Sequence, residues 1–143
     1  MPVAVVDANV LVSWRLESDQ NHRRGNEICT AASNGELPKL RVPYPFLQEA
    51  VKHVHNDAGL GEATKTYEAV RADEMFVIVY PNENDYRRGY ALFETTSDLE
   101  LPDAVGVAYM RRVGVGHIYS FDSGFDGKRD IERWNTAHDP YAP

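Results

Sequence analysis

The sequence predicts an α/β fold in which a mostly parallel sheet lies between two layers of helices, a three-layer α/β/α sandwich. Two apolar runs, residues 3–6 and 75–80, contain several valines and show no polar alternation, which is typical of strands buried on both faces of a parallel sheet. Segments with apolar residues at helical spacing lie between the predicted strands. Because strands and helices alternate along the chain, we expect parallel strands with helices on both faces.

Turn-forming residues divide the first half of the chain. The Asn-Gly pair at 34–35 ends a helix that Asp19 could cap, since these residue types favour the backbone that follows a helix. A glycine at 59 follows a helix whose apolar residues form a stripe. The elements predicted here are a strand at 3–6, helices at 9–16 and about 20–33, a proline-bounded strand at 38–43, and helices at 44–56 and about 61–72.

Proline and glycine also mark the boundaries in the second half. Pro81 ends a strand, Asn82 can cap the next helix, and Pro102 suits the first residue of a helix, where its missing N–H does no harm. The elements predicted here are the strand at 75–80, a helix from 82 to about 95, a helix from 102 that closes at Gly114, a strand at 117–121 and an edge strand at 131–134.

The whole chain, residues 1–143, is predicted to form a single domain with a loose tail after about residue 135, which contains two prolines. No apolar run approaches the length of a membrane span, and the N-terminus enters a strand directly, without a signal peptide. Cys29 is the only cysteine, so we expect no disulfide framework and no cysteine-based zinc site. These features together predict a cytoplasmic protein without a membrane partner.

The formal net charge is −7, from 15 basic and 22 acidic residues, which disfavours non-specific binding to nucleic acid. Part of this charge could belong to a cation site. Alternatively, the whole surface could be acidic, as in halophiles, which the excess of arginine over lysine weakly favours. An ordinary acidic cytosolic protein explains the charge at least as well.

Three aspartates are placed to meet at one edge of the predicted sheet. Asp7 and Asp122 each follow a predicted strand, and Asp103 lies in the first turn of a predicted helix. Strand ends and helix starts share the carboxyl edge of a parallel sheet, where ligand sites form. Glu49 could reach this edge from a neighbouring helix. Four carboxylates without matching cations would repel one another, and a hard divalent ion such as Mg²⁺ would relieve that repulsion.

Ser120 and Asn9 could hold these carboxylates in place. Ser120 lies two residues before Asp122 and points to the same side of the strand, so its hydroxyl could orient a carboxylate or a water. Asn9 could add neutral hydrogen bonds. Each acid alone has an ordinary explanation: a helix cap for Asp7, a first-turn acid for Asp103, a solvated helix position for Glu49 and a turn residue for Asp122. Their joint occurrence favours a metal site.

The same residues resemble the motifs of the PIN-domain nucleases, and in particular the small VapC-type toxins of prokaryotic toxin–antitoxin pairs. The resemblance extends from residue 3 to about 134 and depends on the order and spacing of four motifs. These are Val6-Asp7-Ala8-Asn9-Val10-Leu11, Leu47-Gln48-Glu49, Leu101-Pro102-Asp103-Ala104 and Ser120-Phe121-Asp122-Ser123-Gly124-Phe125-Asp126. Ser120 stands where the family more often has threonine, and the hydroxyl is kept.

This resemblance implies a Mg²⁺- or Mn²⁺-dependent endoribonuclease with a central parallel sheet of four or five strands. Asp7, Glu49, Asp103 and Asp122 would match the family's acidic quartet as catalytic and metal-binding residues, with Asp126 in a supporting or additional place. Attack of water on the RNA phosphodiester would leave a 5′-phosphate. The resemblance also implies a homodimer and a small, separately encoded antitoxin that blocks the site.

An RNA-cutting enzyme needs local positive charge to contact phosphates, which is awkward for an acidic protein. The basic pairs of the sequence are the candidates for this contact, although each also suits a solvated helix face. They are Arg23-Arg24, Arg87-Arg88, Arg111-Arg112 and Lys128-Arg129.

Other functions fit parts of the sequence. An aspartyl-nucleophile phosphatase of the haloacid dehalogenase type would need an aspartate where Asn9 stands and a lysine suitably placed before Asp122. A receiver domain would need an aspartate after the strand at 75–80, which ends at Pro81. A non-catalytic PIN-fold binding or regulatory module would usually lack part of the acidic quartet, and none of the four is missing here.

Overall fold

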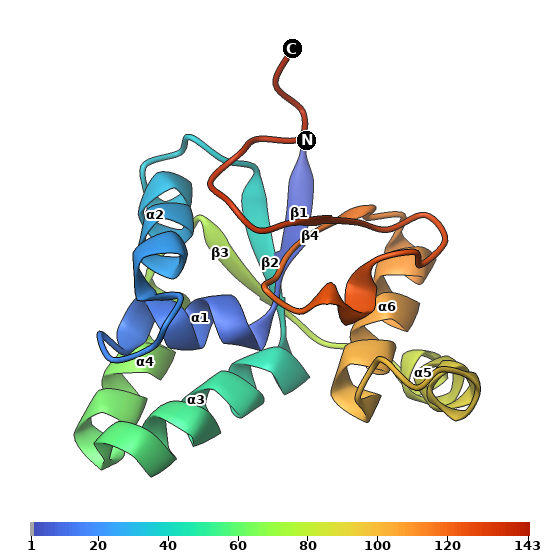
Figure 1. The fold of residues 1–143 in the computed structure, drawn as a ribbon, viewed down its shortest axis with the longest axis horizontal. Helices are drawn as coiled ribbons and strands as arrows, with labels where there is room; N and C mark the ends of the chain where they lie inside the picture. The colour runs from blue at the N-terminus through green and yellow to red at the C-terminus, as the bar shows by residue number, and fades with distance from the viewer. Residues whose placement is uncertain (1) are drawn as a thin grey trace.

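The computed structural model describes residues 2–143 and contains, within that range, one sheet of five parallel strands in the order β3-β2-β1-β4-β5 (Figure 1). The strands are β1 (Val3–Val6), β2 (Lys39–Pro43), β3 (Phe76–Val79), β4 (His117–Tyr119) and β5 (Glu132–Trp134). The predicted parallel sheet is confirmed, and β5 is its edge strand, as expected.

Six α-helices and one short 3-10 helix connect the strands over the described residues. They are α1 (Ala8–Arg15), α2 (His22–Ser33), α3 (Tyr44–Ala58), α4 (Leu60–Ala72), α5 (Glu83–Thr95), α6 (Leu101–Val113) and the 3-10 helix η1 (Ser123–Phe125). Every helix predicted from the sequence is present, with small shifts at the ends. None of the helices in residues 2–143 has both the length and the apolar character needed to cross a membrane.

The order of the strands explains why helices cover both faces of the sheet. From β1 the chain moves outward to β2 and β3 through α1–α4, and it then returns across the sheet to β4 through α5 and α6. Crossovers between parallel strands are almost always right-handed, so the two directions of travel put these helices on opposite faces. In Figure 1, α1–α4 and the α5–α6 pair lie on either side of the strands. The three-layer α/β/α prediction is therefore confirmed.

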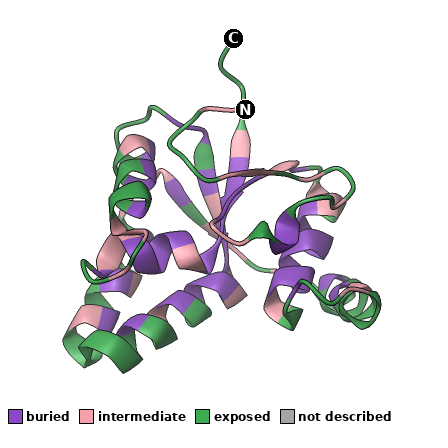
Figure 2. Cartoon of the chain, viewed as in Figure 1, coloured by how far each residue is buried: buried purple, intermediate pink, exposed green. Residues whose placement is uncertain are grey.

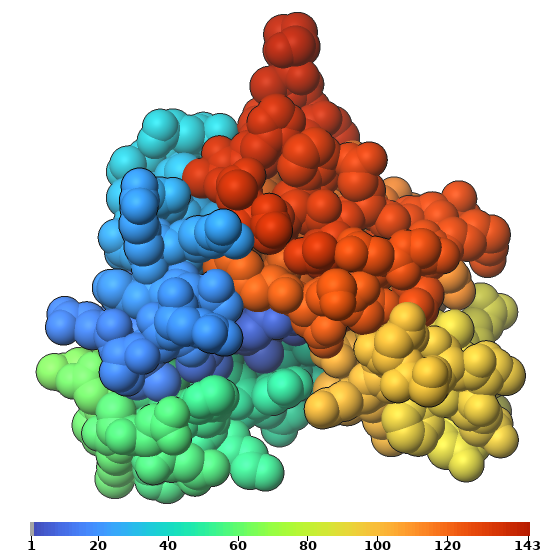
Figure 3. Space-filling model, viewed as in Figure 1, coloured from blue at the N-terminus to red at the C-terminus, as the bar shows by residue number. Residues whose placement is uncertain are grey.

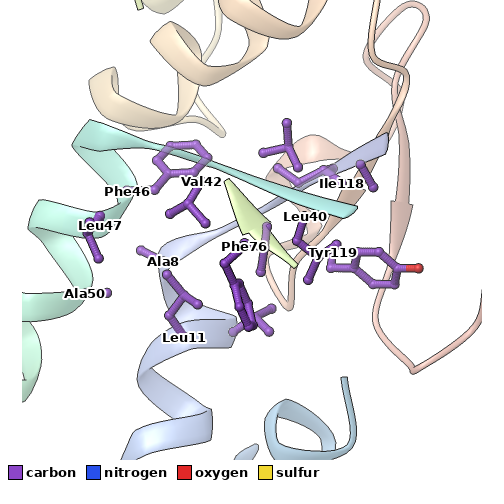
Figure 4. Close-up of a cluster of buried hydrophobic side chains, with 14 of the residues drawn as sticks. Ala8, Leu11, Leu40, Val42, Phe46, Leu47, Ala50, Phe76, Ile118 and Tyr119 are labelled. Carbon is purple, nitrogen blue, oxygen red and sulfur yellow. The ribbon is translucent and has the colours of Figure 1, made fainter. Parts of the chain in front are cut away.

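β1 lies at the centre of the sheet because its side chains suit burial on both faces. Residues 4–6 are fully buried, and buried residues follow the strands and the inner faces of the helices (Figure 2). Phe46 of α3 lies beside Val42 of β2 in this core (Figure 4). A Cβ atom at Gly106 would overlap the Phe46 ring, so glycine allows α6 to approach α3 closely.

β4 ends at Tyr119, two residues earlier than predicted. The Ser120 N–H still donates to the Trp134 carbonyl oxygen of β5 (3.0 Å). The Phe121 N–H instead donates to the side-chain oxygen of Asn9 (3.2 Å). The chain therefore leaves the sheet because a side chain from the first turn of α1 replaces the next strand partner.

The segment after residue 135, which the sequence predicts to be loose, makes specific contacts with the sheet. The Tyr119 hydroxyl donates to the His138 carbonyl oxygen (2.6 Å), and the Tyr141 hydroxyl donates to the Val3 carbonyl oxygen (2.9 Å). The rings of Trp134 and His138 stack with centroids 4.5 Å apart. The prolines suggested a loose tail, but aromatic contacts and these hydrogen bonds attach it to β1, β4 and β5.

Candidate active site

Asp7 lies directly after β1, at the point where the strand order changes direction between β1 and β4. Such a switch point opens a crevice at the carboxyl ends of parallel strands. On the face drawn in Figure 3, a notch separates α3, in green, from the α5–α6 pair, in yellow and orange. Asp7, Glu49, Asp103 and Asp122 come from the elements that surround this edge of the sheet.

The Asp7 carboxylate is buried and held at both oxygens. Its Oδ1 accepts a hydrogen bond from the Ala8 N–H (2.7 Å), which caps α1, and its Oδ2 accepts one from the Ser120 hydroxyl (2.7 Å). The side chain is only 3% exposed. Asp7 is therefore both the helix cap that a simpler interpretation predicts and a fixed carboxylate at the sheet edge.

Ser120 and Asn9 connect the end of β1 to the chain after β4. The Ser120 hydroxyl also accepts a hydrogen bond from the Asp122 N–H (3.0 Å), and the Asn9 side-chain amide donates to the same oxygen (3.4 Å). Since Asn9 also accepts the Phe121 N–H, one small network sets the positions of Asp7 and Asp122 relative to each other. The sequence predicts this orienting role for both residues.

The backbone after β4 holds the Asp122 side chain through η1. Its Oδ1 accepts a hydrogen bond from the Gly124 N–H (2.8 Å). A Cβ atom at Gly124 would overlap the carbonyl oxygen of Asp98, so glycine is needed for the loop to pass this close to the segment that leads into α6. The turn after Asp122 is therefore locked against the start of the helix that carries Asp103.

Asp103 lies in the first turn of α6 and is buried. Burial, together with the negative charges of Asp7, Glu49 and Asp122, raises the pKa of Asp103 to about 8. The pKa of Asp7 is likewise raised to about 7, because burial and the charges of Glu49 and Asp122 outweigh the opposing effect of its hydrogen bonds. Both groups are destabilised as anions because water is excluded and like charges are near.

Glu49 of α3 is coupled to the same group of charges. Burial raises the pKa of Glu49, and the nearby carboxylates of Glu100 and Asp122 raise it too, while His53 and Lys52 lower it. Glu100, which directly precedes α6, is a fifth acid at this edge that the sequence interpretation did not include. Its position three residues before Asp103 was the available signal.

A family comparison identifies what kind of domain carries this arrangement. The model of the PIN domain matches residues 4–130, a span that contains all four acids. The chain belongs to the PIN-domain family. The predicted resemblance is thereby confirmed at the level of family. A search of curated protein sequences finds no match to the chain.

Solved structures with this PIN fold include toxins of toxin–antitoxin pairs. The Mycobacterium tuberculosis toxin VapC20, described as cleaving the sarcin–ricin loop, matches with a TM-score of 0.74 and 14% identity, over 85% of this chain and 91% of its own. A toxin–antitoxin complex from Klebsiella pneumoniae matches with a TM-score of 0.64 and 19% identity, over 95% of this chain and 98% of its own. VapBC2 from Rickettsia felis, bound to a fragment of its promoter DNA, matches with a TM-score of 0.66 and 11% identity, over 94% of this chain and 100% of its own.

The acids of this PIN domain fit a divalent cation by their chemistry. Carboxylate oxygens are the ligands that Mg²⁺ and Mn²⁺ prefer, and the raised pKa values of Asp7 and Asp103 record an excess of negative charge that a cation would neutralise. Among residues 2–143, no three Asp, Glu, His or Cys side chains are grouped closely enough to hold one ion as they stand. The side chains would therefore have to move inward to bind a shared ion.

Asp126 is paired differently from the other acids. The guanidinium of Arg133 in β5 donates to both of its oxygens (2.8 and 3.0 Å) and also to the Ser120 carbonyl oxygen (3.2 Å). The hydrogen bond from Arg133 lowers the pKa of Asp126. Arg133, which the sequence interpretation did not select, thus neutralises Asp126 and supports the backbone that carries Ser120.

Most of the basic residues predicted to contact RNA are engaged in ion pairs. Arg112 donates to both oxygens of the buried Asp85 (2.8 and 2.9 Å), so it joins α6 to α5. The exposed or partly exposed pairs are Arg23–Glu27, Arg87–Glu83, Lys128–Asp98 and Arg129–Asp130. Arg24 and Arg88 are exposed and form no ion pair with any residue in the described range.

Proposed function

We propose that the chain is a divalent-metal-dependent endoribonuclease that acts as the toxin of a VapBC-type pair. The observation that carries the proposal is the placement of Asp7, Glu49, Asp103 and Asp122 around one carboxyl edge, where burial and the neighbouring negative charges raise the pKa of the first three. An anionic cluster of this kind suits a cation that activates water and orients a phosphodiester. Membership of the PIN family supports the same conclusion.

In this proposal, Asp7, Glu49, Asp103 and Asp122 would hold Mg²⁺ or Mn²⁺. The bound ion would supply a Lewis acid that lowers the pKa of a water and neutralises charge on the phosphate. Ser120 and Asn9 keep the Asp7 carboxylate in one orientation, and Arg133 together with Asp126 keeps the Ser120 backbone in place. Hydrolysis by in-line attack of water would leave a 5′-phosphate on the product.

The basic residues that remain available suggest where RNA would lie. Arg24 and Arg88 are exposed, and the exposed pairs of Arg23, Arg87 and Arg129 are weak enough to exchange a carboxylate for a phosphate. Lys128 is mostly covered and binds both oxygens of Asp98. It would contribute to loop structure more than to RNA binding.

The same proposal includes two protein partners in the cytoplasm. Two of the structural neighbours are toxin–antitoxin complexes, so we propose that a small antitoxin, separately encoded, binds this chain and covers its acids. We also propose a homodimer. The face of α5 exposes Tyr86, Tyr90 and Phe93, and aromatic side chains of this kind are enriched in protein–protein interfaces.

The test is an assay of RNA cleavage in the presence of Mg²⁺. The negative controls are the same reaction with EDTA and the Asp7→Asn variant. We expect Asp7→Asn to lower the rate by more than about 100-fold, because the loss of a supporting residue alone costs about 10–100-fold at metal sites. Glu68→Gln, which removes an exposed carboxylate of α4 that pairs with Arg71, should cleave like the native chain. Equal cleavage by Asp7→Asn would contradict the proposal.

Ser120 offers a test of positioning that does not remove a ligand. We expect Ser120→Ala to reduce cleavage by about 10–100-fold and to raise the Mg²⁺ concentration at half-maximal rate, because Asp7 loses the hydroxyl that holds its Oδ2. Ser120→Thr keeps the hydroxyl and should retain most of the activity. If the alanine and threonine variants behaved alike, the hydroxyl would have no such role.

One observation favours a second candidate, a non-catalytic PIN-fold module. No group of three potential ligands in residues 2–143 is arranged to hold an ion without rearrangement. Titration calorimetry with Mg²⁺ separates the two candidates: heat that disappears in Asp7→Asn favours the nuclease, whereas the absence of binding favours the module.

A further inference from the structure

A cavity lies at the opposite edge of the sheet from the acids. It has a volume of about 550 Å³ and is lined by the segment before β4, the segment before β5, the last turns of α6 and part of α5. Because all strands are parallel, residues that precede β4 and β5 mark the amino edge. From Gly116 to Ser120 the backbone covers roughly 13 Å at about 3.3 Å per residue, so this cavity is distinct from the acidic site.

Three arginines from different elements meet around this cavity, although the protein as a whole is acidic. Arg88 comes from α5, Arg111 from α6 and Arg129 from the loop before β5, and Asp130 is the only acid in the lining. The charge of this lining is therefore +2, against a net charge of −7 for the chain. Such a local concentration of guanidinium groups creates a positive potential that attracts an anion.

Two of these arginines have unused hydrogen-bonding capacity. The Nε atom of Arg111 is buried and has no acceptor among the described residues, and leaving a buried donor unpaired is unfavourable. Arg88 is exposed and takes part in no ion pair within residues 2–143. Arg129 pairs only with Asp130 at the surface, and exposed pairs of this type contribute little. Arg88 and Arg129 could therefore turn toward a ligand, whereas Arg111 is already held beside the cavity by a hydrogen bond from its Nη2 to the Arg129 carbonyl oxygen (3.3 Å).

One of the carbonyl groups at the end of α6 is satisfied by hydrogen bonds from the chain that follows the helix. Helix C-termini favour cations because of their free carbonyl groups. The Met110 carbonyl oxygen, however, accepts hydrogen bonds from the N–H groups of both Gly114 and Val115. The charged group that this end of α6 presents to the cavity is the Arg111 guanidinium.

From this geometry we infer that the cavity between α5, α6 and the loop before β5 binds a phosphate ester of about mononucleotide size. Guanidinium groups match phosphate oxygens in pairs of hydrogen bonds. The apolar part of the wall, Leu92, Ala108, Met110 and Val115, suits the less polar remainder of such a ligand. The volume lies within the range of about 300–1,000 Å³ that is typical of small-molecule sites. The phosphate could belong to a free nucleotide or to the end of an RNA chain.

Titration calorimetry on the full chain in EDTA tests this site without any need for nuclease activity. The probes are inorganic phosphate, adenosine monophosphate, and a short RNA with or without a 5′-phosphate. We expect Arg88→Gln and Arg129→Gln each to weaken binding by about tenfold or more. Arg71→Gln removes the same charge from an exposed position of α4, outside the lining, and should leave binding unchanged.

The outcomes separate the sources of the phosphate. Binding of adenosine monophosphate that Arg88→Gln weakens supports a free nucleotide, and binding only of 5′-phosphorylated RNA with the same response supports an RNA end. If the Asp7→Asn variant still binds the same probe, the binding site is separate from the acids. No binding of any probe up to about 10 mM, or an equal loss in Arg71→Gln and Arg88→Gln, would overturn the inference.

Discussion

Replacing Asp103 with asparagine is expected to make the metal-free protein more stable at pH 8 while abolishing RNA cleavage. Asp103 is buried, and burial together with three neighbouring carboxylates raises its pKa to about 8. At this pH the native side chain is partly ionised at a site that disfavours the anion. Asparagine is nearly isosteric and cannot ionise, so the free energy of unfolding should rise by roughly 1–3 kcal/mol.

Chemical denaturation of both proteins in EDTA, at pH 5 and pH 8, measures this effect. The stability difference should be largest at pH 8 and small at pH 5, where the native Asp103 is protonated. Asp126→Asn is the matched control, because it removes an aspartate whose pKa Arg133 lowers, and it should destabilise the protein instead. If Asp103→Asn were less stable than the native chain at pH 8, the proposed electrostatic strain would not exist.

A gain in stability with a loss of cleavage would explain why four acids persist in so unfavourable a place. Most positions in a core are selected for packing, and polar groups there are paired. Asp7 has partners for both oxygens, but its pKa remains raised because those partners do not offset burial and the charges of Glu49 and Asp122. The stability that the apo protein gives up is recovered only when a cation binds.

The sequence predicts the parallel sheet, and it places the candidate acids at one edge of that sheet, because both depend on local patterns. The buried run that ends at Asp7 identifies the central strand, and the alternation of strands with helices implies that Asp7, Asp103 and Asp122 share an edge. The two-residue spacing between Ser120 and Asp122 was sufficient to predict that Ser120 faces the acids. The hydrogen bond from Ser120 to Asp7 spans 113 positions, yet it follows directly from the pairing of β1 with β4.

Residues whose role depends on tertiary pairing could not be predicted in this way. Arg112 and Arg87 have the same local context of paired arginines on a helix, but Arg112 binds the buried Asp85 whereas Arg87 pairs at the surface. Arg133 reaches Asp126 only because β5 joins the edge of the sheet beside β4. No periodicity or spacing in a single sequence distinguishes these partners, since each depends on which elements become neighbours.

The metal-free protein is expected to lose stability as the pH rises from about 5 to 8, and excess Mg²⁺ should reverse this loss. The folded-state pKa values of Asp7 and Asp103, about 7 and about 8, lie above the ordinary value of 3.8, and that of Glu49 is raised as well. A carboxyl with a raised folded pKa contributes stability that is complete below its unfolded pKa and disappears as the pH passes its folded pKa. Stability should therefore fall by several kcal/mol across this window.

Other acids do not hide this trend, because Asp85, Asp98 and Asp126 have lowered pKa values and affect stability only at more acidic pH. Thermal unfolding between pH 5 and pH 8.5, with EDTA or with Mg²⁺, measures the effect. Calorimetry in buffers of different ionisation enthalpy should also detect protons released when Mg²⁺ binds near pH 7, since the ligands must be deprotonated. A metal-free stability that is flat from pH 5 to 8, or Mg²⁺ binding without proton release, would mean that these carboxyls are already ionised and that no cation is needed to hold them together.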